Sequence, residues 1–265
     1  MVHHCWKAQG RGQGEAMRRF VVDHILPDQG VVLIEGAEAR HIAKALRMEP
    51  GDEIVVMDSE GMRYHGLIQS IGTSRVAVEV KGPIATPDTP PLDMVLCQAV
   101  LKAKAMDLVI QKVTELGASR IVPFLSRRTV IRLDEKRGEN KLRRWKEIAR
   151  NATAQCDRAI PPQIDGVTDF RQLLSATSRE DGLKVILWEQ ERSRDLKDVL
   201  RQAGPQEKIV GMVGPEGGFS REEVVQAMEV GFVPISLGRR ILRAETAAMV
   251  LVTLCLYEWG DLGLD

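Results

Sequence analysis

The chain has 265 residues, of which 44% are hydrophobic and 28% are charged, and its acidic and basic side chains balance at 37 each. This composition is typical of an ordinary globular protein with an ample core, and a net charge of zero argues against a strongly basic nucleic-acid binder. No apolar run reaches transmembrane length and the start does not resemble a secretory signal, so we expect a cytoplasmic protein without membrane contact. The four cysteines form no Cys-x-x-Cys pair and the five histidines lack metal-ligand spacing, so no metal site is predicted.

Residues 1–16 are rich in Gly and Gln and lack hydrophobic periodicity, so they are predicted to be a disordered extension. Residues 17–83 follow as a domain of short strands, expected at 31–34, 53–57, 64–68 and 75–80, with one helix at 38–46. Strands at this spacing indicate a small β-barrel. Arg40, His41, Lys44 and Arg47 fall on about one face of that helix, which suits contacts with phosphates, although a solvated charged face is the simpler alternative.

Four prolines between Lys81 and Pro91 indicate a linker, placed at residues 84–92. The domain from 93 to 265 then alternates strands with helices. Strands are expected at 94–101, 121–125, 184–188, 209–213 and 233–237, and helices at 106–116, at 196–202, after Ser220 and from Ala244 onwards. The last of these is apolar on nearly every side, as a buried helix is. This alternation predicts a parallel α/β domain.

Two loops in this domain are rich in glycine and small residues. The segment GPEGG at 214–218 follows the strand at 209–213, and Gly238 with the basic segment 239–243 follows the strand at 233–237. An S-x-x-E capping box, Ser220 to Glu223, starts the intervening helix, and Gly231 is placed to end it. Because consecutive strands of a βαβ unit are parallel, both loops should lie at one sheet edge, where ligands usually bind. Neither loop is a P-loop or a G-x-G-x-x-G motif, and two ordinary βα turns are the alternative.

Residues 126–150 hold ten basic and four acidic side chains, a local excess of +6 in a chain that is neutral as a whole. Such an excess is the electrostatic footprint of an RNA contact, and the basic residues 239, 240 and 243 beside the second glycine loop extend it. A solvated helix with i,i+4 pairs such as Arg143 with Glu147 is the alternative.

The motifs GPEGGFS at 214–220 and LGRRILRAETA at 237–247, with Glu223 and Gly231-Phe232 between them, resemble the C-terminal signature of the RsmE family. The block at 101–130 and the positions 155, 156 and 158 resemble further segments of the same family. The chain departs from the family pattern at Ile42, Ala103, Arg127 and Ala154, where the family commonly has histidine, glycine, glutamate and glutamate.

This resemblance implies an α/β fold with two domains: an N-terminal PUA-like, RNA-binding β-barrel at 17–83 and a C-terminal SPOUT α/β domain with a trefoil knot at 93–265. It implies a methyltransferase that uses S-adenosylmethionine (SAM) to methylate N3 of a specific uridine in 16S ribosomal RNA of the small subunit. It also implies a homodimer whose cofactor site is completed across the two copies.

The resemblance and the chemistry together select the site residues. Arg243 is the candidate that stabilises negative charge on the base oxygens, with a surface phosphate contact as the alternative. Either Glu245 or Glu216 is the candidate that accepts the N3 proton. Cofactor binding is assigned to Leu187, Glu189, Gly214, Pro215, Glu216, Gly217, Leu237, Gly238, Ile241, Leu242 and Thr246. RNA binding is assigned to Arg18, Arg19, Arg40, His41, Arg47, Lys102 and Arg158.

Two other classes of function compete with a methyltransferase. A non-catalytic RNA-binding or ribosome-assembly protein would keep the fold, but its glycine loops should be eroded, and here they are intact. A nucleotide-hydrolysing enzyme needs a Walker lysine and a pattern of Mg²⁺ ligands, neither of which the sequence contains.

Overall fold

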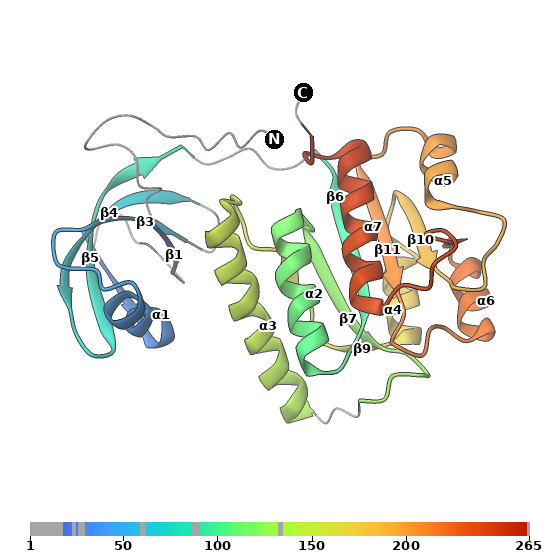
Figure 1. The fold of residues 1–265 in the computed structure, drawn as a ribbon, viewed down its shortest axis with the longest axis horizontal. Helices are drawn as coiled ribbons and strands as arrows, with labels where there is room; N and C mark the ends of the chain where they lie inside the picture. The colour runs from blue at the N-terminus through green and yellow to red at the C-terminus, as the bar shows by residue number, and fades with distance from the viewer. Residues whose placement is uncertain are drawn as a thin grey trace, which may run out of the picture. The chain divides into compact units, whose positions relative to one another are not determined.

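The computed structural model describes residues 18–22, 25, 30–58, 62–85, 91–131 and 135–263, and Figure 1 shows its ribbon. The chain forms two compact units, residues 1–86 and 87–265, so the division falls inside the proline-rich segment. The extension predicted to be disordered, residues 1–16, lies outside the described residues. No helix in the part of the chain that the structure describes is long and apolar enough to cross a membrane.

The first unit is built on a five-stranded sheet in the order β1 (Arg19–Val21), β3 (Glu53–Met57), β4 (Arg63–Ile71), β5 (Arg75–Ile84) and β2 (Val31–Glu35). β1 pairs with β3 in parallel, and the other neighbours are antiparallel. Alternate residues of β2 are buried, and Val32 and Ile34 pack in one core with residues of β3 and β5. The strands predicted here are confirmed, but β5 runs on to Ile84. Pro83 is tolerated in it because β2 borders only residues 75–79 of that strand.

The helix predicted at 38–46 is instead two short segments, α1 (Gly36–Arg40) and a π-helical turn (His41–Ala45). The backbone N–H of Leu46 closes the turn on the carbonyl of His41, and Arg47 follows in the left-handed conformation with φ 51°. Arg47 therefore lies beyond the helix. The four basic residues expected on one helical face are all exposed, but they do not share a continuous helix.

The second unit is built on a parallel seven-stranded sheet, as predicted. Its order is β12 (Val233–Ile235), β10 (Leu183–Leu187), β11 (Lys208–Val213), β6 (Asp93–Ala99), β7 (Arg120–Leu125) and β8 (Gln163–Ile164), with β9 (Thr168–Asp169) also paired to β7. Every pairing is parallel, so the carboxyl ends of β10, β11 and β12 lie at one edge. The short β-branched runs of the sequence form the central strands.

Helices cover both faces of this sheet (Figure 1). α2 (Ala103–Leu116), α3 (Glu135–Cys156), α5 (Leu196–Ala203) and α7 (Ala244–Trp259) share one core cluster, while α4 (Phe170–Thr177) and α6 (Arg221–Glu229) share another. The two clusters lie on opposite faces because side chains alternate along a strand, so Ile209 of β11 joins the first cluster and Val210 joins the second.

α3 takes the helical form that was the alternative for the basic segment, and α7 differs from what its sequence indicates. The basic segment forms most of α3, an amphipathic helix that buries Trp145 and Ala149 while its charged residues face outwards. α7, predicted to be buried all round, is buried on one side only, because Leu254 and Tyr257 are 42% and 70% exposed.

Candidate active site

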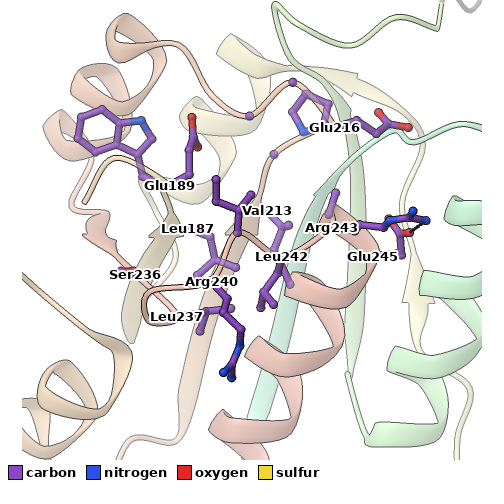
Figure 2. A pocket seen from close by; sticks show the side chains of 18 of the residues that line it. Leu187, Glu189, Val213, Glu216, Ser236, Leu237, Arg240, Leu242, Arg243 and Glu245 are labelled. Atoms are coloured by element: carbon purple, nitrogen blue, oxygen red, sulfur yellow. Dashed lines mark ion pairs between the residues drawn. The ribbon is translucent and has the colours of Figure 1, made fainter. Parts of the chain in front are cut away.

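A cavity of about 660 Å³ opens at the edge of the sheet where β10, β11 and β12 end (Figure 2). Three segments surround it: the loop 188–195 after β10, the glycine loop 214–218 after β11, and the loop 236–243 between β12 and α7. The sequence predicted that the two glycine loops meet at one edge, and the parallel register brings them there. The size falls within the range of small-molecule sites.

The lining of this cavity separates into an apolar wall and a charged border. Apolar side chains come from the strand ends and the start of α7, namely Leu187, Val213, Ile235, Leu237, Leu242, Ala244 and Ala247. The carboxylates of Glu189, Glu216 and Glu245 border the cavity, together with the basic side chains of Lys102, Arg192, Arg239, Arg240 and Arg243. The cavity thus offers both an apolar surface and charges of each sign.

Three glycines of the loop 214–218 lie close to side chains of the protein. A Cβ atom at Gly214 would lie 3.1 Å from the Phe219 ring, and one at Gly217 would lie 3.3 Å from Cβ of Arg128. Gly218 has φ +66°, and a Cβ atom there would lie 2.8 Å from a carboxylate oxygen of Glu189. The positive φ favours glycine at 218, and a larger residue at 214 or 217 would require the Phe219 ring or the Arg128 side chain to shift by a few tenths of an ångström.

Hydrogen bonds hold the glycine loop to its neighbours. The backbone N–H of Lys102, after β6, donates to Oε1 of Glu216 at 3.2 Å, and Nη1 of Arg128 donates to the carbonyl of Gly217 at 2.8 Å. The backbone N–H of Gly218 donates to the carbonyl of Pro215 at 2.9 Å. The loop is therefore fixed from two adjacent strands as well as within itself.

The predicted capping box is present at the start of α6. The hydroxyl of Ser220 accepts from the backbone N–H of Glu223 at 3.2 Å, and Oε2 of Glu223 accepts from the backbone N–H of Ser220 at 2.9 Å. The other oxygen of Glu223 accepts from the backbone N–H of Arg127 at 2.9 Å. Gly231, with φ +92°, follows the helix as expected.

The loops after β10 and β12 are joined by backbone hydrogen bonds. Ser236 donates through its N–H to the carbonyl of Arg194 at 2.9 Å and accepts at its carbonyl from the N–H of Leu196 at 3.2 Å. Oε1 of Glu191 accepts from Ser193 and from the backbone N–H groups of the same loop, and the hydrogen bonds from Ser193 hold the pKa of Glu191 below its usual range. Both loops are consequently well defined around the cavity.

Arg243 and Glu245 stand at the first turn of α7 (Figure 2). Nη1 of Arg243 lies 3.9 Å from Oε1 of Glu245, and the Arg243 side chain is 87% exposed whereas that of Glu245 is 17% exposed. The pair therefore places a mostly shielded carboxylate beside a guanidinium that reaches into solvent.

Two buried polar atoms at the strand ends lack a partner among the described residues. They are Nε1 of Trp188, which lines the cavity, and Oε1 of Gln98 at the end of β6. The side-chain amide of Gln98 donates to the carbonyls of Ala99 at 2.9 Å and Gly214 at 3.5 Å. Buried polar atoms are rarely left unpaired, so these two are exceptions among the described residues.

The structure brings nearly all the predicted cavity residues together. Arg243, Glu245, Lys102 and every residue assigned to cofactor binding line the cavity, with the single exception of Thr246. Sequence reasoning missed Arg192, Val213 and Ser236. The rule that ligands bind beyond the carboxyl ends of parallel strands could have found Val213 and Ser236, since each stands at or just after a strand end.

The residues assigned to RNA binding are scattered over both units. Arg18, Arg40, His41 and Arg47 are exposed in the first unit, and Nη1 of Arg18 donates to the carbonyl of Leu46 at 3.3 Å. Arg158 is placed differently. Its Nη1 donates to the carbonyls of Thr114 and Ala118, each at 2.8 Å, and burial lowers its pKa. This guanidinium closes the carboxyl end of α2, so the structure argues against its assignment as a phosphate contact.

Comparisons with known proteins agree with this geometry. A family model described as an RNA methyltransferase domain matches residues 88–256, and a model described as an RNA methyltransferase PUA domain matches residues 34–81. Ribosomal RNA small subunit methyltransferase E of Mycobacterium bovis is 32% identical over 236 residues, 87% of this chain and 88% of its own length. The enzyme of the same name from Bacillus subtilis is 30% identical over 228 residues, 85% of this chain and 89% of its own length.

The chain belongs to the ribosomal RNA small subunit methyltransferase E family. The solved structure of a family member from Neisseria gonorrhoeae, bound to S-adenosyl methionine, has 31% identity and a TM-score of 0.84, and covers 93% of this chain and 100% of that one. The predicted fold class, a PUA-like domain followed by a SPOUT-type α/β domain, is confirmed for this family member.

Proposed function

We propose that the protein transfers a methyl group from SAM to N3 of a specific uridine in 16S ribosomal RNA of the small subunit. The observation that carries this proposal is the cavity beyond β10, β11 and β12, where an apolar wall, three carboxylates and a border of guanidinium groups meet. SAM, when bound, supplies a methyl group on a positively charged sulfur. The residues present fit such a molecule, because carboxylates attract the sulfonium and the apolar wall accepts its adenine.

The predicted cofactor residues form two sides of the proposed SAM site. Leu187, Leu237 and Leu242 supply apolar contacts, and the glycine loop 214–218 supplies backbone groups. Glu189 and Glu216 add negative charge at the border. Thr246 does not line the cavity, so we assign it to helix packing.

We assign the proton transfer to Glu245. Uridine N3 must lose its proton before it can accept a methyl group, and a carboxylate in reach of that proton can take it. Glu245 is the better of the two sequence candidates because its side chain is mostly shielded, while Oε1 of Glu216 already accepts from the backbone of Lys102 and Glu216 is exposed. Arg243, beside Glu245, would stabilise the negative charge that develops on the base oxygens.

We assign binding of the ribosomal RNA backbone to the basic residues outside the SAM site. Lys102, Arg192, Arg239 and Arg240 border the cavity, where a flipped uridine would carry its flanking phosphates. In the PUA domain, Arg18, Arg19, Arg40, His41 and Arg47 are the proposed contacts. The basic face of α3 supplies further positive charge.

We further propose that the protein acts as a homodimer in the cytoplasm and that its chain is knotted. The exposed apolar side chains Leu254 and Tyr257 of α7, with Leu108 of the adjacent α2, offer a surface for a second copy. The knot rests on the family resemblance, while the backbone bonds between the loops 188–195 and 236–243 extend the pairing of β10 with β12.

The test of the proposed function measures binding and product separately. Titration calorimetry of the protein with SAM should show binding, and Leu237→Trp, which fills the cavity, should abolish it. Val225→Trp, on the exposed surface of α6, is the matched control. Small subunits from cells without the enzyme, incubated with SAM and protein, are then digested to nucleosides. Detection of 3-methyluridine supports the proposal, whereas RNA binding without SAM binding would support a non-catalytic RNA-binding protein.

A further inference from the structure

The buried carboxylate of Glu223 joins the loop after β7 to Ser220, the residue that starts α6 just beyond the glycine loop. Its side chain is only 5% exposed, and both oxygens accept hydrogen bonds from backbone N–H groups, Oε1 from Arg127 and Oε2 from Ser220, each at 2.9 Å. A capping box needs only the second of these bonds. The first reaches 96 residues back along the chain, to the loop that follows β7. Glu223 therefore does more than start α6.

The loop after β7, which Glu223 holds, is itself bonded to the glycine loop. Its turn is closed by the N–H of Thr129 on the carbonyl of Ser126 and by the N–H of Ser126 on the hydroxyl of Thr129, both at 3.0 Å. Within that turn, Arg128 donates from Nη1 to the carbonyl of Gly217 at 2.8 Å, and its aliphatic stem covers Gly217. The carboxylate of Glu223 and the guanidinium of Arg128 thus hold both ends of the segment 217–220.

We propose that Glu223 is a positioning residue for the methyl donor, acting with Arg128 to hold the glycine loop in its binding shape. This inference rests on the proposed function, because it takes the cavity to be the SAM site. The geometry demands a carboxylate at 223. Two N–H donors face its two oxygens, and a glutamine can accept only one of them, since its NH₂ group would face the other donor. A loop released at one end loses preorganisation, which weakens binding.

The experiment is calorimetric titration of Glu223→Gln with SAM in the absence of RNA. We expect the Kd for SAM to rise about tenfold, the loss typical of one charge-assisted hydrogen bond. In steady-state assays the KM for SAM should rise by a similar factor, while kcat at saturating SAM and the KM for RNA change less than about twofold. Arg128→Met, at an exposed position that keeps the stem over Gly217, should act in the same direction. In the double variant the Kd for SAM should rise by less than the product of the two single increases, because both changes act on one loop.

Gln172→Ala is the matched control, since Gln172 occupies the equivalent position in the capping box of α4, away from the cavity. It should lower the melting temperature as Glu223→Gln does and leave the Kd for SAM unchanged. If the wild type itself does not bind SAM, the proposed function fails. If the wild type binds and both Glu223→Gln and Arg128→Met bind equally well, the positioning role is overturned. If Glu223→Gln does not fold, the Kd of Arg128→Met decides.

Discussion

Nη1 of Arg243 lies 3.9 Å from Oε1 of Glu245, at the mouth of the cavity and at the first turn of α7. The distance is long for a hydrogen bond, so the two groups attract each other without being locked together. The exposed guanidinium is free to turn towards a substrate, while the shielded carboxylate stays beside the cavity. These exposures suit the proposed roles. A general base needs access to a single proton and can be shielded, whereas an arginine that binds a large substrate must reach into solvent.

Glu245→Gln should remove the proposed proton acceptor and leave cofactor binding intact. We expect kcat for methylation to fall about 100-fold or more, the range of general-base catalysis, with the Kd for SAM changed less than about threefold. Single-turnover methylation of small subunits measures the first quantity and calorimetry the second. Glu258→Gln, at the exposed far end of the same helix, is the control. A kcat within threefold of wild type would transfer the role to Glu216.

Arg158→Met should lower stability without weakening RNA binding. Nη1 of Arg158 bonds two carbonyls at the end of α2, and a hydrogen bond from a charged donor contributes about 1.5–3 kcal/mol. We expect the free energy of unfolding in urea to fall by about that amount, and the RNA affinity of the folded variant to match wild type. A variant of normal stability that binds RNA poorly would restore the phosphate contact that the sequence suggested.

The sequence predicted most of the fold because its local signals were strong. The capping box at Ser220, the glycine at 231 and the short apolar runs each depend on residues close in the chain, and each is present in the structure. The glycine loops located the cavity because parallel strands share an edge. Nearly every residue that was predicted to line the cavity was selected because it belongs to a sequence motif.

Features that depend on distant residues could not be predicted. The bond from Arg127 to Glu223 spans 96 positions, and the bonds of Arg158 span 40 and 44. The apolar sequence of α7 could not show which side packs on the core and which side stays exposed. The π-helical turn at His41–Ala45 likewise has no marker in the sequence, so the basic residues around it were placed on one face too readily.

Stability should fall as the pH is lowered, through the ion cluster at the amino ends of the strands. Glu180 accepts from Lys208 and, at 2.8 Å, from Arg120, while Asp93 and Asp165 pair with the same two cations. The hydrogen bond from Lys208 holds the pKa of Glu180 below its ordinary value of 4.5. A carboxylate with a lowered pKa stabilises the fold above its ordinary pKa, and that stability is lost as the pH falls through the lower, folded-state value.

Glu180→Gln should therefore make the free energy of unfolding depend less on pH in the acidic range. Thermal unfolding between about pH 7 and pH 3 measures it, and the loss of charge should cost about 1–2 kcal/mol at neutral pH and progressively less in acid. Glu229→Gln, at an exposed position on α6, controls for the change of net charge. A variant whose profile runs parallel to wild type throughout would show that Glu180 does not carry the acid sensitivity.

The exposed apolar side of α7 should form the contact between two copies of the protein. Leu254 and Tyr257 lie one turn apart on the helix, and Leu108 of the neighbouring α2 is 38% exposed. A carboxylate in the centre of an apolar interface would be buried without a partner, so Tyr257→Glu and Leu254→Glu should shift the protein from dimer to monomer in sedimentation velocity. Met228→Glu, on the exposed surface of α6, should leave the dimer unchanged. A monomeric wild type would remove the homodimer from the proposal, and a dimer that survives both α7 variants would place the contact elsewhere.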